Sequence, residues 1–166
     1  RVQQNSSLGV SPSRIILENM SLSDKKGSRC GFRKHVKKDQ TNRYTEMLKT
    51  LDLGLENKLN TQVKFLSGGQ RQSLSLLMAT MKRPDLLLLD EHTAALDPKT
   101  SKVVMEKTME LVRKEKITTL MISHNLRDAI KNTDRIKMQD RGKVIHDTRS
   151  NLISESELIK IYNRQN

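Results

Sequence analysis

Cysteine, aromatic residues and long apolar runs are all scarce in this chain of 166 residues. It contains one cysteine, no tryptophan, two phenylalanines and two tyrosines. A single cysteine cannot form an internal disulfide, which excludes a disulfide-stapled secreted scaffold and favours a reducing, cytoplasmic setting. No run approaches the roughly 18 apolar residues of a membrane-spanning helix, so we do not expect an integral membrane chain. The core is expected to be lean and aliphatic.

Four segments of the chain differ in their patterning. Residues 1–13 are polar and turn-rich, and residues 14–65 are a helical segment around a basic loop. Residues 66–148 alternate strands and helices, and residues 149–166 form a tail. In the second segment, Tyr44, Met47, Leu48 and Leu51 recur at the spacing of one helix face. Gly54 stands where a glycine is expected to end that helix.

Two continuous apolar runs, at 86–89 and 117–122, predict strands buried on both faces. A helical pattern lies between them. The order strand, helix, strand predicts a parallel sheet with right-handed crossover connections. Ligands bind such sheets beyond the carboxyl ends of the strands. Chemistry is therefore expected just after Leu89 and just after Ile122.

The last third of the chain predicts a hairpin and a capped helix. Strands at 135–138 and 143–146 are expected to pair across a turn at 140–142. Ser154 and Glu157 have the spacing of a capping box at the start of an amphipathic helix.

Polar side chains follow both buried runs. Asp90 and Glu91 end the first, and such a pair can hold Mg²⁺ with one carboxylate and accept a proton from water with the other. A solvated acidic loop is the alternative. Ser123 and His124 follow the second run, and a histidine there can donate to a phosphate oxygen. An ordinary surface histidine is the commoner case.

Two further positions resemble helix starts. Ser67, Gly68 and Gly69 precede a helical stripe, and small residues there let backbone N–H groups approach an anion. A plain serine N-cap with a flexible turn explains the same residues. Asp97 followed by Pro98 predicts an N-cap and a first helical residue.

The four motifs become specific when they are taken together. LSGGQRQ at 66–72, LLLLDE at 86–91, TAALD at 93–97 and ISH at 122–124 resemble, in this order, the nucleotide-binding domain of ATP-binding cassette (ABC) proteins. The resemblance implies an α/β fold: the parallel sheet of a P-loop NTPase (RecA-like) with an inserted helical subdomain. The four segments would be the Q-loop segment, the helical subdomain, the signature motif with the RecA-like core, and a C-terminal helix.

The resemblance also implies roles for single residues. The signature motif, which meets the γ-phosphate of ATP held by the opposite subunit, matches Ser67, Gly68, Gly69 and Gln70. Asp90 matches the Mg²⁺ ligand of the Walker B strand, and Glu91 the general base. His124 matches the switch histidine, and Asp97 the D-loop aspartate at the dimer interface. Gln4 matches the Q-loop glutamine near nucleotide and Mg²⁺.

Two departures from the family pattern stand out. His92 replaces the usual proline after Asp-Glu, which changes loop stiffness but removes no catalytic group. No Gly-x-x-x-x-Gly-Lys-[Ser/Thr] occurs, so the cradle and lysine for the β- and γ-phosphates are lacking. We expect this chain to be a portion of a longer ATPase, lacking the P-loop strand, poorly soluble and inactive alone.

The parent protein is expected to be the ATPase subunit of a bacterial ABC transporter, an importer, with ATP and Mg²⁺ as cofactors. It would form a head-to-tail dimer with a second nucleotide-binding subunit and bind membrane permease subunits on the inner face of the membrane. A solute-binding protein is a further expected partner, and an amino-acid-type solute the expected cargo. Two alternatives are a paralogue without a P-loop that donates its signature motif to a partner, and a non-transport ABC ATPase.

Basic residues exceed acidic ones by 31 to 19, a net charge of +12. Many of them lie between Lys25 and Lys38, where Phe32 is the only aromatic residue, so no stacking platform for bases is evident. We interpret this stretch first as a solvated loop, second as a surface attracted to the anionic membrane leaflet, and only third as a nucleic-acid contact.

Overall fold

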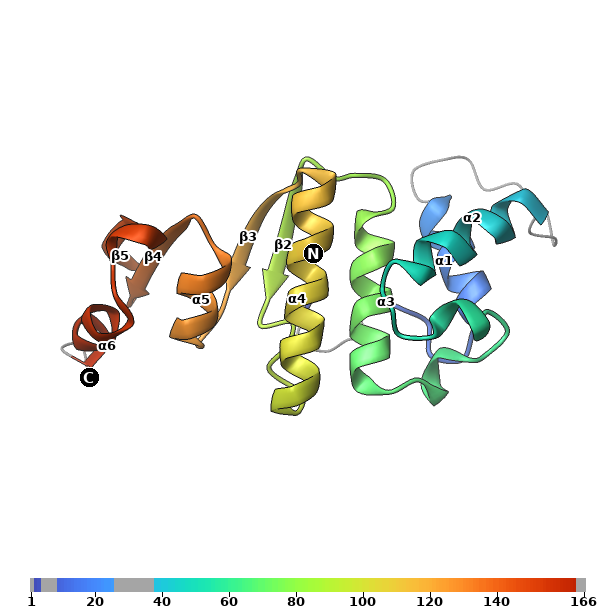
Figure 1. Ribbon diagram of the computed structural model, residues 1–166, viewed down its shortest axis with the longest axis horizontal. Helices are drawn as coiled ribbons and strands as arrows, with labels where there is room; N and C mark the ends of the chain where they lie inside the picture. The colour runs from blue at the N-terminus through green and yellow to red at the C-terminus, as the bar shows by residue number, and fades with distance from the viewer. Residues whose placement is uncertain (1, 4–8, 26–37, 164–166) are drawn as a thin grey trace. The chain divides into compact units, whose positions relative to one another are not determined.

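The computed structural model describes residues 2–3, 9–25 and 38–163 (Figure 1). The chain forms two compact units, Arg1–Met121 and Ile122–Asn166, and each is described by itself. Gln4 and most of the predicted basic loop lie outside the described residues. Among the helices that are described, none combines the length and the apolar character needed to cross a bilayer.

Helices α1 to α3 of the first unit surround the larger of two apolar cores. The helical elements are α1 (Ile16–Asp24), α2 (Lys38–Lys49), the 3-10 turns η2 (Leu55–Asn57) and η3 (Val63–Phe65), and α3 (Gly68–Thr80). The predicted stripe is confirmed, because Tyr44, Leu48 and Leu51 are buried in this core and Met47 packs against it. We call it the helical cluster: Val10, Ile16, Met20, Tyr44, Leu48, Leu51, Leu55, Val63, Leu66, Leu74 and Leu77.

The expected role of Gly54 is wrong. Helix α2 already ends at Lys49, and Gly54 instead precedes η2. Its φ of 68° is left-handed, a conformation that glycine adopts without steric cost. The glycine at position 54 therefore did indicate a left-handed φ, although the element next to it is the 3-10 turn η2 and not the end of α2.

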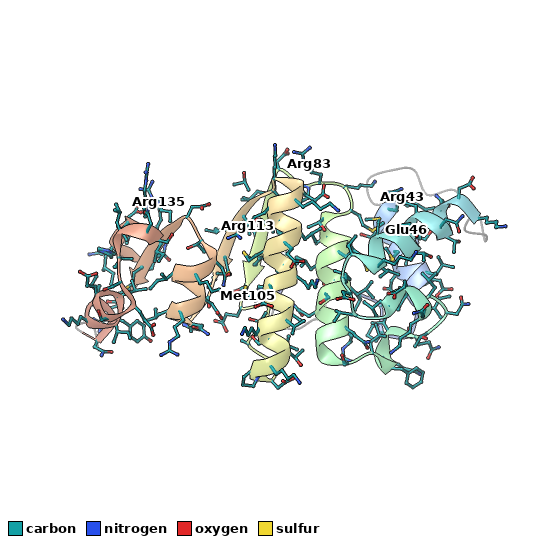
Figure 2. All side chains as sticks on the ribbon, in the orientation of Figure 1. Arg43, Glu46, Arg83, Met105, Arg113 and Arg135 are labelled. Carbon is teal, nitrogen blue, oxygen red and sulfur yellow. The ribbon has the colours of Figure 1, made fainter. Side chains whose placement is uncertain are left out.

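A three-stranded sheet carries the second core of the first unit. The strands are β1 (Val2–Gln3), β2 (Leu86–Asp90) and β3 (Thr118–Ile122), in the order β1-β2-β3. Strand β1 runs parallel to β2 and pairs Gln3 with Asp90. Helix α4 (Pro98–Glu115) connects β2 to β3, as the predicted crossover requires. We call the second core the sheet cluster: Val2, Leu76, Leu87, Leu89, Met105, Met109 and Ile117. Met105, labelled in Figure 2, extends from α4 into it.

The prediction that both apolar strands are buried on both faces is wrong in this structure. Successive side chains of a strand point to opposite faces. Leu87 and Leu89 are buried in the sheet cluster, which includes residues of α3 and α4, whereas Leu86 is 51% exposed. Leu120 of β3 is 57% exposed. Within the described residues, one face of the sheet is therefore covered and the other is largely open.

The second unit contains the predicted hairpin and tail helix. Its elements are α5 (Leu126–Asn132), β4 (Arg135–Asp140), β5 (Lys143–Arg149), η4 (Ser150–Leu152) and α6 (Glu155–Asn163). Strands β4 and β5 pair antiparallel across Arg141 and Gly142, whose φ angles of 45° and 78° suit a two-residue hairpin turn. Ser154 and Glu157 form the expected capping box at α6.

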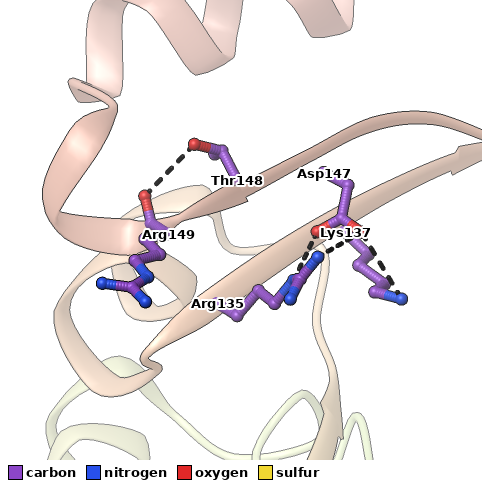
Figure 3. Close-up of polar contacts among 5 residues, drawn as sticks. All are labelled: Arg135, Lys137, Asp147, Thr148 and Arg149. Carbon is purple, nitrogen blue, oxygen red and sulfur yellow. Dashed lines mark hydrogen bonds and ion pairs between the residues drawn. The ribbon is translucent and has the colours of Figure 1, made fainter.

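An ion pair joins the two strands of this hairpin. Asp147 of β5 accepts two hydrogen bonds from Arg135 of β4, at 2.6 and 3.0 Å, and lies 3.5 Å from Lys137 Nζ (Figure 3). The bidentate contact with Arg135 lowers the pKa of the Asp147 carboxyl. In the ladder Arg135 lies opposite Arg149, and Asp147 lies opposite Lys137. The ion pair between Arg135 and Asp147 therefore links diagonal positions of the hairpin.

Candidate functional site

The loop that follows β2 carries the predicted carboxylate pair. Asp90 is the last residue of β2, and Glu91 is the first residue beyond it. Glu91 has a φ of 46°, a left-handed backbone that costs a non-glycine residue on the order of 1–2 kcal/mol. Its carbonyl accepts from the N–H of Ala94 at 3.0 Å, so a tight turn begins at this residue. Other described residues at turns and helix ends, such as Arg141 and Lys116, share this backbone conformation, so by itself it marks a tight turn.

The other end of the same loop is the cap of α4. Asp97 has extended backbone angles, and its Oδ1 accepts from the N–H of Thr100 at 3.1 Å. Pro98 follows as the first helical residue, so the predicted N-cap is confirmed. Hydrogen bonds from Thr100 lower the pKa of the Asp97 carboxyl. Asp97 is therefore an anion that is already engaged in holding the start of a helix.

The signature residues form a fully capped helix start. Ser67 Oγ accepts from the N–H of Gln70 at 3.2 Å, and Gln70 Oε1 accepts from the N–H of Ser67 at 3.1 Å. Gln70 Nε2 also donates to the carbonyl of Leu53 at 3.1 Å. This reciprocal capping fixes the turn and engages the N–H groups of Ser67 and Gln70. The N–H groups of Gly68 and Gly69 lie between them at the start of α3, where an anion at a helix N-terminus would bind.

Close packing explains Gly69, where a Cβ atom would lie 2.4 Å from Thr100 Cγ2. A Cβ atom on Gly68 would lie 3.1 Å from Leu96 Cδ2, a tight contact that a small shift of the leucine side chain can relieve. The start of α3 therefore contacts the loop before α4 and the first turn of α4. The structure brings the signature residues together with the Asp97 end of the loop, and Gly69 is needed for that approach whether or not a nucleotide binds.

His92 is the buried residue of this loop. It is 2% exposed, and its Nε2 lies 3.2 Å from Thr108 Oγ1 on α4. Burial lowers the pKa of His92 to about 4, so the ring is neutral at neutral pH. Sequence reasoning treated His92 as a minor departure and missed this anchor. It also missed the contact between Gly69 and Thr100, for which no sequence signal exists because the two residues lie on different helices.

The remaining predicted residues fall elsewhere. His124 is exposed and belongs to the second unit, in the short segment between β3 and α5. There Ser123 Oγ accepts from the N–H of Asn125, which caps α5. Gln4 lies outside the described residues, although the neighbouring Gln3 pairs with Asp90.

The donor set at the end of β2 suits a hard cation. Within residues 2–3, 9–25 and 38–163, no group of three or more His, Cys, Asp or Glu side chains is arranged to hold a metal. Magnesium commonly binds proteins through only one or two carboxylates and completes its shell with phosphate and water. The carboxylate of Asp90, at the carboxyl end of a parallel strand, fits that mode.

Comparison with known proteins gives the class of this fold. A dimeric ATP-binding cassette in a post-hydrolysis state, bound to ADP and Pi, matches with a TM-score of 0.68 at 26% identity, over 89% of this chain and 62% of that one. A nucleotide-free cassette from an ABC transporter matches with a TM-score of 0.73 at 21% identity, over 98% and 64%. The fold is thus that of the P-loop NTPase cassettes, with a parallel sheet.

Sequence comparison gives the family. The family model described as ABC transporter matches residues 2–94. The chain is 47% identical over 149 residues to a tyrosine transport ATP-binding protein of Clostridioides difficile (strain R20291), covering 90% of this chain and 59% of that protein. It is 39% identical to the phosphonates import ATP-binding protein PhnC of Alcaligenes faecalis, covering 66% and 40%. The chain therefore belongs to the ABC transporter family, and it spans about half the length of these relatives.

Proposed function

We propose that this chain supplies the signature motif, the Walker B carboxylates and the switch histidine of an ATP-hydrolysing subunit of a bacterial ABC importer. The observation that carries the proposal is the loop from Asp90 to Asp97. It begins with two carboxylates at the end of a parallel strand and ends beside the capped signature turn. Membership of the ABC transporter family supports the same function.

The proposed chemistry is the transfer of the γ-phosphoryl group of ATP to water. Glu91 accepts the proton of the attacking water, and Asp90 binds Mg²⁺, which neutralises phosphate charge when it is bound. Gln4 is proposed to contact the nucleotide and Mg²⁺, and His124 to donate to a phosphate oxygen. The signature motif binds the γ-phosphate of ATP on the opposite subunit through Ser67, Gly68, Gly69 and Gln70, with backbone N–H groups as donors. Asp97 lies at that interface.

The proposed partners follow from the same family. The cassette pairs head to tail with a second nucleotide-binding subunit and binds permease subunits at the inner face of the membrane, with a solute-binding protein as a third partner. The dimeric neighbour and the import proteins among the relatives support this assembly. Likeness at 47% identity to a tyrosine transport protein supports an amino-acid-type solute.

The 166 residues by themselves are proposed to be inactive. Positioning and charge stabilisation of the β- and γ-phosphates account for most of phosphoryl-transfer catalysis, and the sequence has no P-loop motif to supply them. The same sequence has a complete signature turn. This combination favours one second function, in which the chain donates its signature turn to ATP held by an intact cassette.

The test is ATP turnover by the longer ATPase of which we propose that this chain is a portion, purified in complex with its permease. We expect Glu91→Gln to lower kcat by about a hundredfold or more, because a general base is removed. Glu106→Gln is the matched control, since Glu106 is an exposed residue of α4 away from the loop. Turnover that survives Glu91→Gln unchanged contradicts the proposal. Turnover that arises only when the chain is mixed with an intact cassette favours the second function.

A further inference from the structure

A buried hydrogen bond connects the loop after β2 to the middle of α4. His92 Nε2 lies 3.2 Å from Thr108 Oγ1, and both residues are buried. The Thr108 hydroxyl donates its only hydrogen to the carbonyl of Val104 at 2.7 Å. Thr108 Oγ1 must therefore accept from His92, so His92 Nε2 carries a hydrogen and donates it.

Glu91 lies between this anchor and the sheet. On its N-terminal side, Asp90 is held in β2, where it pairs with Gln3 of β1. On its C-terminal side, His92 is held by α4. Glu91 itself has the left-handed φ of 46°, which a glutamate adopts only when its surroundings impose it. One fixed neighbour thus lies on each side of Glu91, and its own carbonyl accepts from the N–H of Ala94.

We propose that His92 is a positioning residue for Glu91, and that its hydrogen bond to Thr108 holds Glu91 in the left-handed conformation that aims the carboxylate. The value of this positioning for catalysis rests on the proposed function, because it requires Glu91 to be the general base. The conformational part stands on the geometry of the loop alone.

Substitutions at Thr108 separate the hydrogen bond from packing. Thr108→Val keeps the shape and removes the acceptor, whereas Thr108→Ser keeps the hydroxyl. Thr80→Val is the matched control, because Thr80 is also a buried helix threonine whose hydroxyl bonds carbonyls of its own helix, at Leu76 and Leu77. His92→Phe removes the same hydrogen bond from the other side, because it keeps a ring and lacks the N–H donor.

The first readout is NMR of the purified chain, which needs no activity. In the wild type we expect a slowly exchanging His92 Nε2–H and backbone shifts at Glu91 that report a positive φ. In Thr108→Val the slow N–H is lost and the Glu91 shifts move toward those of an ordinary loop. Thr108→Ser and Thr80→Val keep both signals. Glu91 shifts that stay unchanged in both Thr108→Val and His92→Phe overturn the proposal.

The second readout is the split between kcat and KM in the permease complex. A misaligned base lowers kcat by about tenfold in Thr108→Val and His92→Phe, and leaves the KM for ATP within about twofold. Thr108→Ser, which keeps the hydroxyl, and Thr80→Val both have the wild-type kcat. A kcat that stays at the wild-type value although the Glu91 shifts move overturns the catalytic part. If Glu91→Gln does not lower turnover, the proposed function fails, and the Glu91 shifts still decide whether His92 positions that residue.

Discussion

The two apolar cores of the first unit differ in how completely they are enclosed. The helical cluster draws buried side chains from helices and turns on several sides. The sheet cluster is covered by α3 and α4 on one face, while Leu86 and Leu120 on the other face are about half exposed. The loop from Asp90 to Asp97 follows a strand of this half-covered sheet. Within the described residues, the helical cluster is therefore expected to contribute more to stability than the open face of the sheet.

The largest expected effect tests whether the helical cluster dominates stability. Leu48→Ala removes a fully buried side chain, and we expect it to lower the free energy of unfolding by about 2–5 kcal/mol. Leu120→Ala on the open sheet face is the matched control and should change it by less than about 0.5 kcal/mol. Urea denaturation of the two variants measures the contrast. Equal losses would mean that the two regions do not differ.

A smaller effect tests the contact between the signature turn and α4. Alanine normally favours a helix over glycine, but a Cβ on Gly69 would meet Thr100 Cγ2 at 2.4 Å. We expect Gly69→Ala to destabilise the protein by about 1–3 kcal/mol, and Thr100→Ser, which deletes that methyl group, to restore most of the loss. Thermal unfolding of the single and double variants is the measurement. A stable Gly69→Ala variant would refute the steric explanation.

The smallest effect concerns the polar edge of the helical cluster. The Tyr44 hydroxyl donates to Asp24 Oδ2 at 2.9 Å, so Tyr44→Phe should cost about 1 kcal/mol at neutral pH. Burial, and then the bond to Asp24, raise the pKa of Tyr44 from 10 to about 12. Between pH 10 and 12 the unfolded chain loses this proton while the folded chain keeps it, so stability falls as pH rises through that window.

Urea titrations at pH 9, 10 and 11 check this dependence. The loss of stability over that range should be smaller in Tyr44→Phe than in the wild type, because the variant has no phenol to titrate. Tyr162→Phe, which changes an exposed ring of α6, serves as the control. The same pH dependence in all three proteins would show that Tyr44 does not contribute.

Local patterns predicted much of this fold. The stripe containing Tyr44 and Leu48 gave α2, Asp97 and Pro98 gave the start of α4, and Ser154 gave the start of α6. Each of these signals depends only on residues within one or two helical turns. It can therefore be recognised in the sequence without knowing which surfaces pack together. The hairpin turn at Arg141 is local in the same sense.

Features that depend on which surfaces meet were not predictable. Four consecutive leucines mark a strand, but they do not say which alternate side chains will be covered, and Leu86 remained open. The site shows the same division. The order of motifs predicts that Asp90 and Glu91 are site residues, and that stays a prediction. The left-handed backbone of Glu91 and the burial of His92 could not be predicted, because they depend on α4, which follows later in the chain.

Helix α3 contributes to both cores, since Leu74 and Leu77 belong to the helical cluster and Leu76 belongs to the sheet cluster. An amide of this helix can exchange its hydrogen with solvent only when the helix opens, and opening would expose both clusters together. The two cores are therefore expected to open together, and the slowest-exchanging amides of α3 should report on both of them.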